Sequence, residues 1–244
     1  MPETIKYRNA IAKILNDRIV KEQEFNTLKD FPIVAGKQAM YIMDWQKSQL
    51  VYVHGIYEML GYTEAEFTME LAMNYIHPDD LDIVTRILKG VINLATDPDI
   101  RVKNEYLNVT FRLLKKDGMY LKVMRQSSPY QTDQDGRFIS NVSVITDISF
   151  MNATSNLVEW ELFADNVDIS KFKQNIYKEF SNFFTTRELE IVHLIKNDFT
   201  NKKIAVQLFI SQHTVVAHRK NIYKKSNCHN SKELLKFCKQ NRII

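Results

Sequence analysis

The sequence predicts an α+β protein, with an N-terminal antiparallel sheet flanked by short helices and a C-terminal domain made only of helices. Residues after 105 alternate between apolar and polar side chains and contain two Asp-Gly pairs typical of hairpins. Residues after 184 instead have apolar side chains at helical spacing. Residues 181–244 carry 12 Lys and Arg against 4 Asp and Glu, and this local net charge of +8 predicts a polyanionic partner for the C-terminal domain.

Length and composition indicate two globular domains. The chain has 244 residues, of which 45% are hydrophobic and 25% charged. We expect no membrane span and no secretion signal, and therefore a cytoplasmic protein, because no apolar run approaches 18 residues. The two cysteines, Cys228 and Cys238, predict no disulfide framework. A metal site that adds His218 and His229 to them is the less favoured alternative, so we expect no metal.

The N-terminal segment, residues 1–34, is predicted to be an amphipathic helix. Residues 4–28 contain no Gly or Pro, and Tyr7, Ile11 and Leu15 recur at helical spacing. This apolar stripe could pack on the following domain or pair with a second copy of the chain.

A sheet domain is predicted for residues 35–150. Two short strands, at 40–45 and 50–54, precede helices at 56–60, 64–75 and 79–96. Three further strands, at 107–115, 120–130 and 138–146, form an antiparallel meander through Asp-Gly turns. A strand around Trp160 and a helix capped by Asp168 or Ser170 then make an ordered connector at 151–182.

This order of elements resembles a PAS sensor domain. Four stretches carry the resemblance: YEMLGY at 57–62, IHPDD at 76–80, FRL with KDG at 111–118, and VITDI at 144–148. The resemblance makes His77 a fold-defining loop residue rather than a heme or metal ligand. It also implies a pocket for an unidentified small molecule, although we predict no cofactor. A light-sensing flavin is not expected, because the domain has no cysteine.

The C-terminal domain, residues 183–244, is predicted to be a helix-turn-helix. Thr185 with Glu188 fits a capping box, and Thr200 and Ser211 fit the caps of a second and third helix. The turn between the second and third helices is short, so the two helices must cross.

The third helix can be divided into faces at about 100° per residue. Val215, His218 and Ile222 fall on one side, which we expect to pack inward. The opposite side combines two small apolar residues with two long cations, a combination that suits contacts with base edges and phosphates. These outward residues are Val216, Ala217, Lys220 and Lys224.

The same residues are similar to the LuxR-type DNA-binding domain. The matching stretches are TTRE at 185–188, NKKIA at 201–205, IS at 210–211, TVVAHRKNI at 214–222 and KK at 224–225. The resemblance implies four helices, the last at 231–239 often contributing to dimer contacts. Base contacts then fall on Val216, Ala217 and Lys220, and phosphate contacts near Lys202, Thr214 and Asn221. The complete set of expected DNA-binding residues is Thr200, Lys202, Lys203, Ser211, Thr214, Val216, Ala217, Arg219, Lys220, Asn221 and Lys224.

Three departures from the family pattern concern turns and caps. Asp198 stands where the family has a glycine, which predicts a reshaped turn. Lys203 replaces a glutamate and puts a cation in the first turn of a helix, where the helix dipole disfavours it. Ser226 and Asn227 replace Leu-Gly, which weakens a core contact before the fourth helix.

Together these features predict a bacterial transcriptional regulator that binds double-stranded DNA as a homodimer, with no catalytic residue and no enzymatic activity. The PAS-like domain would sense a ligand or mediate dimerisation. One alternative is a response regulator with a divergent phospho-receiver in front of the same tail. Another is an unrecognised enzyme domain fused to that tail.

Overall fold

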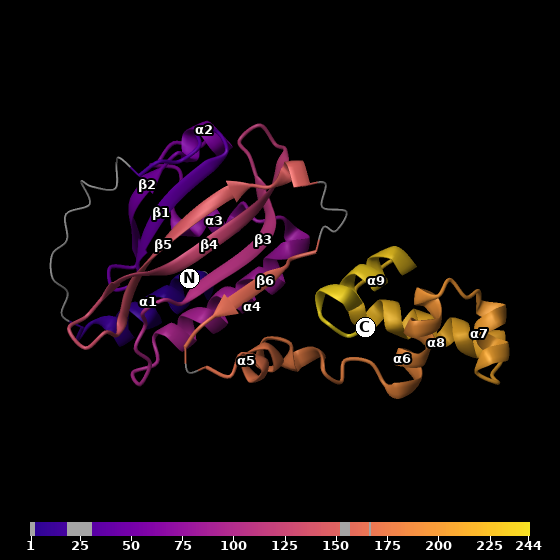
Figure 1. Cartoon of the computed structure of the whole chain (residues 1–244). Coiled ribbons are helices and arrows are strands. Elements are labelled where there is room, and N and C mark those ends of the chain that lie inside the picture. The colour runs from indigo at the N-terminus through magenta and orange to yellow at the C-terminus, as the bar shows by residue number, and fades with distance from the viewer. Residues whose placement is uncertain (1–2, 19–30, 152–156, 166) are drawn as a thin grey trace. The chain divides into compact units, whose positions relative to one another are not determined.

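The computed structural model describes residues 3–18, 31–151, 157–165 and 167–244, and the chain divides into two compact units, Met1–Ile169 and Ser170–Ile244. In its described part the first unit combines a sheet with helices, whereas the second contains only helices (Figure 1). This division confirms the predicted α+β class.

The first unit is built on one antiparallel sheet with the strand order β2-β1-β5-β4-β3-β6. A phospho-receiver would need a parallel sheet with alternating strands and helices, so the phospho-receiver alternative is wrong for this unit. The elements in chain order are α1 (Glu3–Leu15), β1 (Gln38–Asp44), β2 (Gln49–His54), α2 (Ile56–Leu60), α3 (Met69–Asn74), α4 (Pro78–Ala95), β3 (Tyr106–Leu114), β4 (Tyr120–Thr132), β5 (Phe138–Asp147), a 3₁₀ turn (Ser149–Met151) and β6 (Trp160–Phe163).

The predicted meander is confirmed. β3 pairs with β4 and β4 with β5, both antiparallel, through turns that contain Gly118 and Gly136. Both glycines have positive φ values, 87° and 79°, which explains why the Asp-Gly pairs allow such tight reversals.

One face of the sheet carries the core of the first unit. Buried and half-buried residues alternate along β3, with Leu107, Val109 and Phe111 pointing inward. The helices α1 and α4 lie over this face (Figure 1), and Ile11 of α1 and Ile92 of α4 share a buried cluster with sheet residues. The apolar stripe of α1 was expected to pack either on the following domain or on a second copy of the chain. In the described residues it packs on the following domain.

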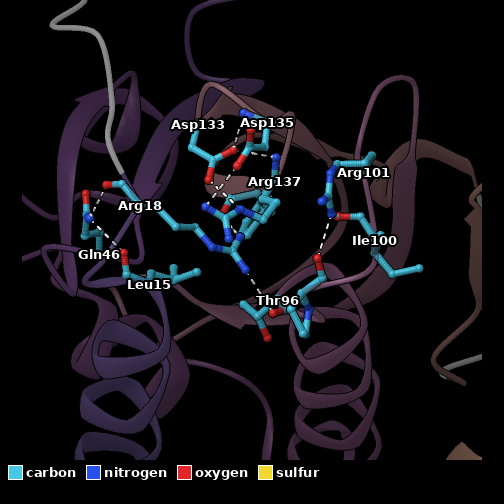
Figure 2. Close-up of polar contacts among 11 residues, drawn as sticks. Leu15, Arg18, Gln46, Thr96, Ile100, Arg101, Asp133, Asp135 and Arg137 are labelled. Atoms are coloured by element: carbon cyan, nitrogen blue, oxygen red, sulfur yellow. Dashed lines mark hydrogen bonds and ion pairs between the residues drawn. The ribbon is translucent and has the colours of Figure 1, made fainter.

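The N-terminal helix is shorter than predicted. It ends at Leu15, where the Gln46 side chain donates hydrogen bonds to the carbonyls of Leu15 and Arg18, at 2.8 and 2.9 Å (Figure 2). Arg18 itself is buried and donates to the carbonyls of Thr96 and Phe138. Contacts from distant parts of the chain thus terminate the helix, and the rest of the predicted helix, residues 19–28, lies outside the described residues.

The helix predicted at 64–75 is also shorter, since α3 covers only Met69–Asn74. The Glu66 carboxylate turns back to accept hydrogen bonds from the amide and hydroxyl of Thr63, which closes a separate turn at 64–66. His77 caps α4, because its Nδ1 accepts from the Asp79 amide at 3.1 Å. That cap agrees with the structural role predicted for His77.

The strand predicted in the connector is an edge strand of the sheet. β6 pairs with β3, with Leu162 opposite Leu107. The second unit then comprises α5 (Ile169–Ile176), a 3₁₀ turn (Lys178–Phe180), α6 (Thr186–Lys196), α7 (Asn201–Gln207), α8 (Gln212–Ser226) and α9 (Ser231–Gln240). None of the helices in the described ranges is both long and apolar enough to cross a bilayer.

Candidate nucleic-acid interface

Hydroxyl caps begin the three helices that precede and form the candidate interface. The Thr185 side chain accepts from the Glu188 amide in a complete capping box at the start of α6. Thr200 accepts from the Lys203 amide before α7, and Ser211 from the Thr214 amide before α8, at 3.3 and 3.0 Å. All three predicted caps are confirmed. Thr200 and Ser211 therefore stabilise the helix starts, whether or not they also contact DNA.

An apolar cluster fixes how α8 sits in the second unit. Val215 and Ile222 are fully buried and pack with Val192 of α6, Ile204 of α7 and Leu234 of α9. The inward side of α8 is therefore the predicted one, except that His218 is only half-buried.

The opposite side of α8 is open to solvent. Val216 is 50% exposed, and Ala217, Lys220 and Lys224 are exposed as well. An apolar side chain left half exposed on the same side of a helix as two cations is the arrangement expected of a surface that a partner covers. We call Val216, Ala217, Lys220 and Lys224 the outward face of α8.

The cations around this face have no acidic partners among the described residues. Lys202, on the first turn of α7, is exposed like Lys220 and Lys224, and none of the three forms an ion pair in the described ranges. Uncompensated Lys side chains on one surface make a positive potential that favours phosphate.

Lys203 keeps its unfavourable place in the first turn of α7 with the help of an aromatic ring. Its Nζ lies 5.9 Å from the centre of the Phe199 ring, within the range of a cation–π contact. This contact offsets part of the cost of the cation at the helix start, but it does not replace the hydrogen bond of a capping-box glutamate.

Arg219 holds three helices of the unit together. Its guanidinium donates to Asn201 Oδ1 at 3.1 Å, to Tyr223 OH at 2.8 Å and to Ser231 Oγ at 2.9 Å, joining α8 to α7 and α9. The sequence had placed Arg219 only among the expected DNA-binding residues. Its expected contact with DNA stays a prediction. The guanidinium would have to make that contact while it also bonds α7 and α9.

The remaining predicted residues lie beside the outward face. Asn221 is exposed on α8, and Thr214 is half-buried with its hydroxyl 2.8 Å from that of Ser211. The structure thus gathers the predicted residues on adjoining parts of α7 and α8, while their contacts with DNA remain predictions.

Two turns have left-handed backbone at residues other than glycine. Asp198 and Asn227 adopt φ values of 58° and 52°. Asp and Asn tolerate this conformation, which glycine adopts most readily, and Asn227 caps the end of α8 in it; the expected reshaping of the turn at Asp198 stays a prediction. The Ser226 hydroxyl bonds the Ile222 carbonyl at 2.9 Å, and α9 follows as expected.

An exposed aromatic residue lies in the turn between α7 and α8. Phe209 is 96% exposed with a φ of 54°, next to Val206, which is 70% exposed. Phe209 was not among the expected DNA-binding residues, although a large apolar residue in the turn between two helices is itself a signal of exposure.

A buried carboxylate ties α6 to α8. Glu188 accepts from Thr185 N at 2.9 Å and from Lys225 Nζ at 2.6 Å. Burial alone would raise the pKa of Glu188, but the hydrogen bonds from Lys225 and Thr185 hold that pKa below its ordinary value. The ionised form therefore stabilises the second unit.

We expect Glu188→Gln to lower the free energy of unfolding of the second unit by about 1–2 kcal/mol at pH 7, because glutamine keeps the capping geometry but loses the charge. A carboxyl whose folded pKa is depressed stabilises the fold above its unfolded pKa, about 4.3, and this contribution disappears as pH falls through the folded pKa. The difference between wild type and variant should therefore shrink below about pH 4 in denaturant titrations.

Glu190→Gln is the matched control, because Glu190 pairs with Arg187 at 2.7 Å on an exposed surface. It should change stability by less than about 1 kcal/mol. A Glu188→Gln penalty that stayed constant between pH 7 and pH 3 would contradict the assigned role of the charge.

No group of three or more His, Cys, Asp or Glu side chains that could hold a metal ion occurs within the described residues. Cys238 is buried in the apolar cluster, and this burial raises the pKa of its thiol to about 12. The cysteine is thus a core residue.

Comparison with known proteins assigns both domains. Residues 182–238 match the family model of bacterial regulatory proteins, luxR family, and residues 50–145 match the PAS fold. The Fimbriae Z protein of Salmonella typhimurium is 33% identical over 60 residues, which cover 25% of this chain and 29% of that protein. The oxygen regulatory protein NreC of Staphylococcus carnosus is 40% identical over 58 residues, 24% of this chain and 27% of that protein. Each match therefore spans less than a third of the relative.

Among solved structures, the phage VqmA–DPO complex is 14% identical over 88% of each chain with a TM-score of 0.35. The N-terminal domain of a diguanylate cyclase with a PAS/PAC sensor from Marinobacter aquaeolei is 20% identical, with a TM-score of 0.39, over 47% of this chain and 98% of that one. The two family models carry the assignment: the chain has a C-terminal domain of the luxR family of bacterial regulatory proteins, preceded by a PAS-fold domain.

Proposed function

We propose that this protein is a sequence-specific DNA-binding transcriptional regulator whose PAS-fold domain senses a small molecule or mediates dimerisation. The observation that carries the proposal is the outward face of α8, where Val216 and Lys220 are exposed while Val215 and Ile222 are buried. A helix so placed can enter the major groove, with small apolar side chains against thymine methyl groups and lysines at guanine acceptors or phosphates.

The protein acts in this proposal as a homodimer, with one copy of α8 in each of two half-sites about one helical turn apart. Its partner is chromosomal DNA, so its place of action is the cytoplasm of a bacterium. It performs no catalysis, and its output is a change in DNA occupancy.

Two alanine variants separate reading of sequence from attraction to phosphate. Lys220 lies in the middle of the outward face, whereas Lys202 lies on the first turn of α7. We expect Lys220→Ala to cost about 1–3 kcal/mol of binding at the preferred sequence and to relax the preference for it. Lys202→Ala should weaken binding to all DNA sequences alike. It should also reduce the slope of the logarithm of the association constant against the logarithm of salt concentration by about 1.

The measurement begins with selection of a preferred duplex from a random library by the full-length protein. Competition titrations then compare the selected duplex with a scrambled one for wild type and both variants. If both variants lost the same amount of preference for the selected duplex, the assignment of roles would be wrong. If neither variant lost affinity for DNA, the proposed interface would be wrong.

A further inference from the structure

A partly open cavity of about 80 Å³ lies between α4 and the face of the sheet that carries the core. Apolar side chains form most of its wall, among them Trp45 just after β1, Leu88 of α4, Leu107 of β3 and Phe138 of β5. About 10–15 Å³ suffices for one water, so the cavity has room for a small organic molecule.

One cation reaches into this apolar space. Arg125, on the central strand β4, is 7% exposed and lines the cavity. Its Nε donates to Tyr41 OH at 2.6 Å and its Nη2 to Ser143 Oγ at 3.0 Å. Its Nη1 is buried and donates to no atom in the described parts of the chain.

The surroundings of Arg125 do not neutralise its charge. The neighbouring inward side chains form a hydrogen-bonded row of neutral groups, in which Ser127 and Asn141 both bond the Ser143 hydroxyl, at 2.8 and 2.9 Å. Arg125 forms no ion pair within the described ranges, in contrast to Arg8 at an adjacent cavity, which pairs with Glu70 at 2.7 Å.

Two carboxylates also line the cavity, at its more open parts. Asp165 is exposed, and Glu105 is half-buried with its carboxylate bonded to the Lys103 amide. A buried guanidinium that lacks a counter-ion in an apolar cavity is a binding site for an anion that comes from outside. Arginine suits a carboxylate, because its planar donors match the two oxygens.

We propose that the PAS-fold domain binds a small organic monocarboxylate, with its apolar body against Trp45, Leu88 and Phe138 and its carboxylate on Nη1 of Arg125. This assignment rests on the sensing role in the proposed function and names the class of ligand sensed. The neutral row of Ser127, Asn141 and Ser143 keeps the guanidinium oriented, and no protein carboxylate competes at its buried end in the described residues.

The test uses the full-length protein and three acids, isovalerate, benzoate and phenylacetate, each beside its neutral amide. Binding is measured by isothermal titration calorimetry and by the shift in Tm. At least one acid should bind at least tenfold more tightly than its amide and raise Tm. Equal affinity of acids and amides, or no binding by any acid, would overturn the proposal.

Variants locate the site. Arg125→Met should lower the affinity for the acid at least tenfold and leave the affinity for its amide unchanged. Arg125→Lys should retain part of the preference for the acid over the amide. Arg18→Met is the control, because Arg18 is another buried arginine of the same unit, donates to the carbonyls of Thr96 and Phe138 and does not itself line the cavity (Figure 2). It should bind the acid like wild type. Undiminished binding to Arg125→Met would contradict the site, and the acid–amide comparison on wild type decides the ligand class even if that variant does not fold.

DNA titrations with and without the bound acid keep the two proposals apart. A ligand that binds through Arg125 but leaves DNA affinity unchanged supports the ligand class and contradicts ligand control in the proposed function.

Discussion

Val216→Glu is expected to weaken binding of the full-length protein to its preferred duplex by about 100-fold or more. Val216 belongs to the outward face of α8, one turn before Lys220, and it is 50% exposed. A carboxylate there would oppose phosphates and the acceptor edges of bases at close range, and like-charge contacts of this kind cost several kcal/mol, with 1.4 kcal/mol for each factor of ten. The fold should survive, because the new charge points into solvent in the free protein.

His193→Glu is the matched control for that variant. His193 is exposed on α6, outside the outward face, so the variant introduces the same carboxylate in the same unit. We expect less than a fivefold loss of affinity from the long-range charge alone. Fluorescence anisotropy with a labelled duplex measures both affinities, and circular dichroism checks the folding of both proteins. Equal affinity losses for Val216→Glu and His193→Glu would show that the outward face does not meet DNA.

Arg112→Met is expected to lower the free energy of unfolding of the first unit by about 3–5 kcal/mol. Asp80, at the start of α4, is 0% exposed, and its carboxylate accepts from the backbone N and Nε of Arg112 at 2.9 Å each and from Nη2 at 2.5 Å. Burial would lower the pKa of Arg112, but Asp80 and Asp79 raise it above its ordinary value. Loss of the guanidinium leaves a buried carboxylate with one backbone donor, and the contact between α4 and β3 weakens.

Arg86→Met provides the comparison, because Arg86 of α4 bonds Asp82 at 2.9 Å, and the Asp82 side chain is 75% exposed, so no buried carboxylate loses its partner. It should cost less than about 1 kcal/mol. The double variant Asp80→Asn with Arg112→Met should recover part of the loss, since it removes the unpaired charge. Denaturant titrations followed by the fluorescence of Trp45 and Trp160 measure these values. Similar losses for Arg112→Met and Arg86→Met would contradict the importance of the buried pair.

The fold of the first unit follows from local patterns where those patterns are strong. Alternation and Asp-Gly turns correctly predicted the three meander strands, because the period of two and the positive φ of Gly118 and Gly136 are local properties. The end of α1 at Leu15 could not be predicted in this way. The side chain that donates to the carbonyl of Leu15 belongs to Gln46, which lies in a turn 31 residues away.

The interface shows the same division. The helical period alone placed Val215 and Ile222 inside and Val216 and Lys220 outside. Sequence reasoning missed the contacts of Arg219 with α7 and α9 and the pair of Glu188 with Lys225, because both depend on how helices cross. Arg125 could have been noticed, since it occupies an inward position between Val123 and Ser127 in an alternating strand.

The salt dependence of DNA binding by the full-length protein tests the central claim most directly. The claim is that the outward face of α8 and the neighbouring Lys202 meet the phosphates and bases of a duplex. We expect the logarithm of the association constant to fall linearly with the logarithm of salt concentration, with a slope that becomes shallower by about 1 when Lys202 is replaced by alanine. An affinity that does not change with salt, or a slope that is the same in wild type and Lys202→Ala, would contradict the claim.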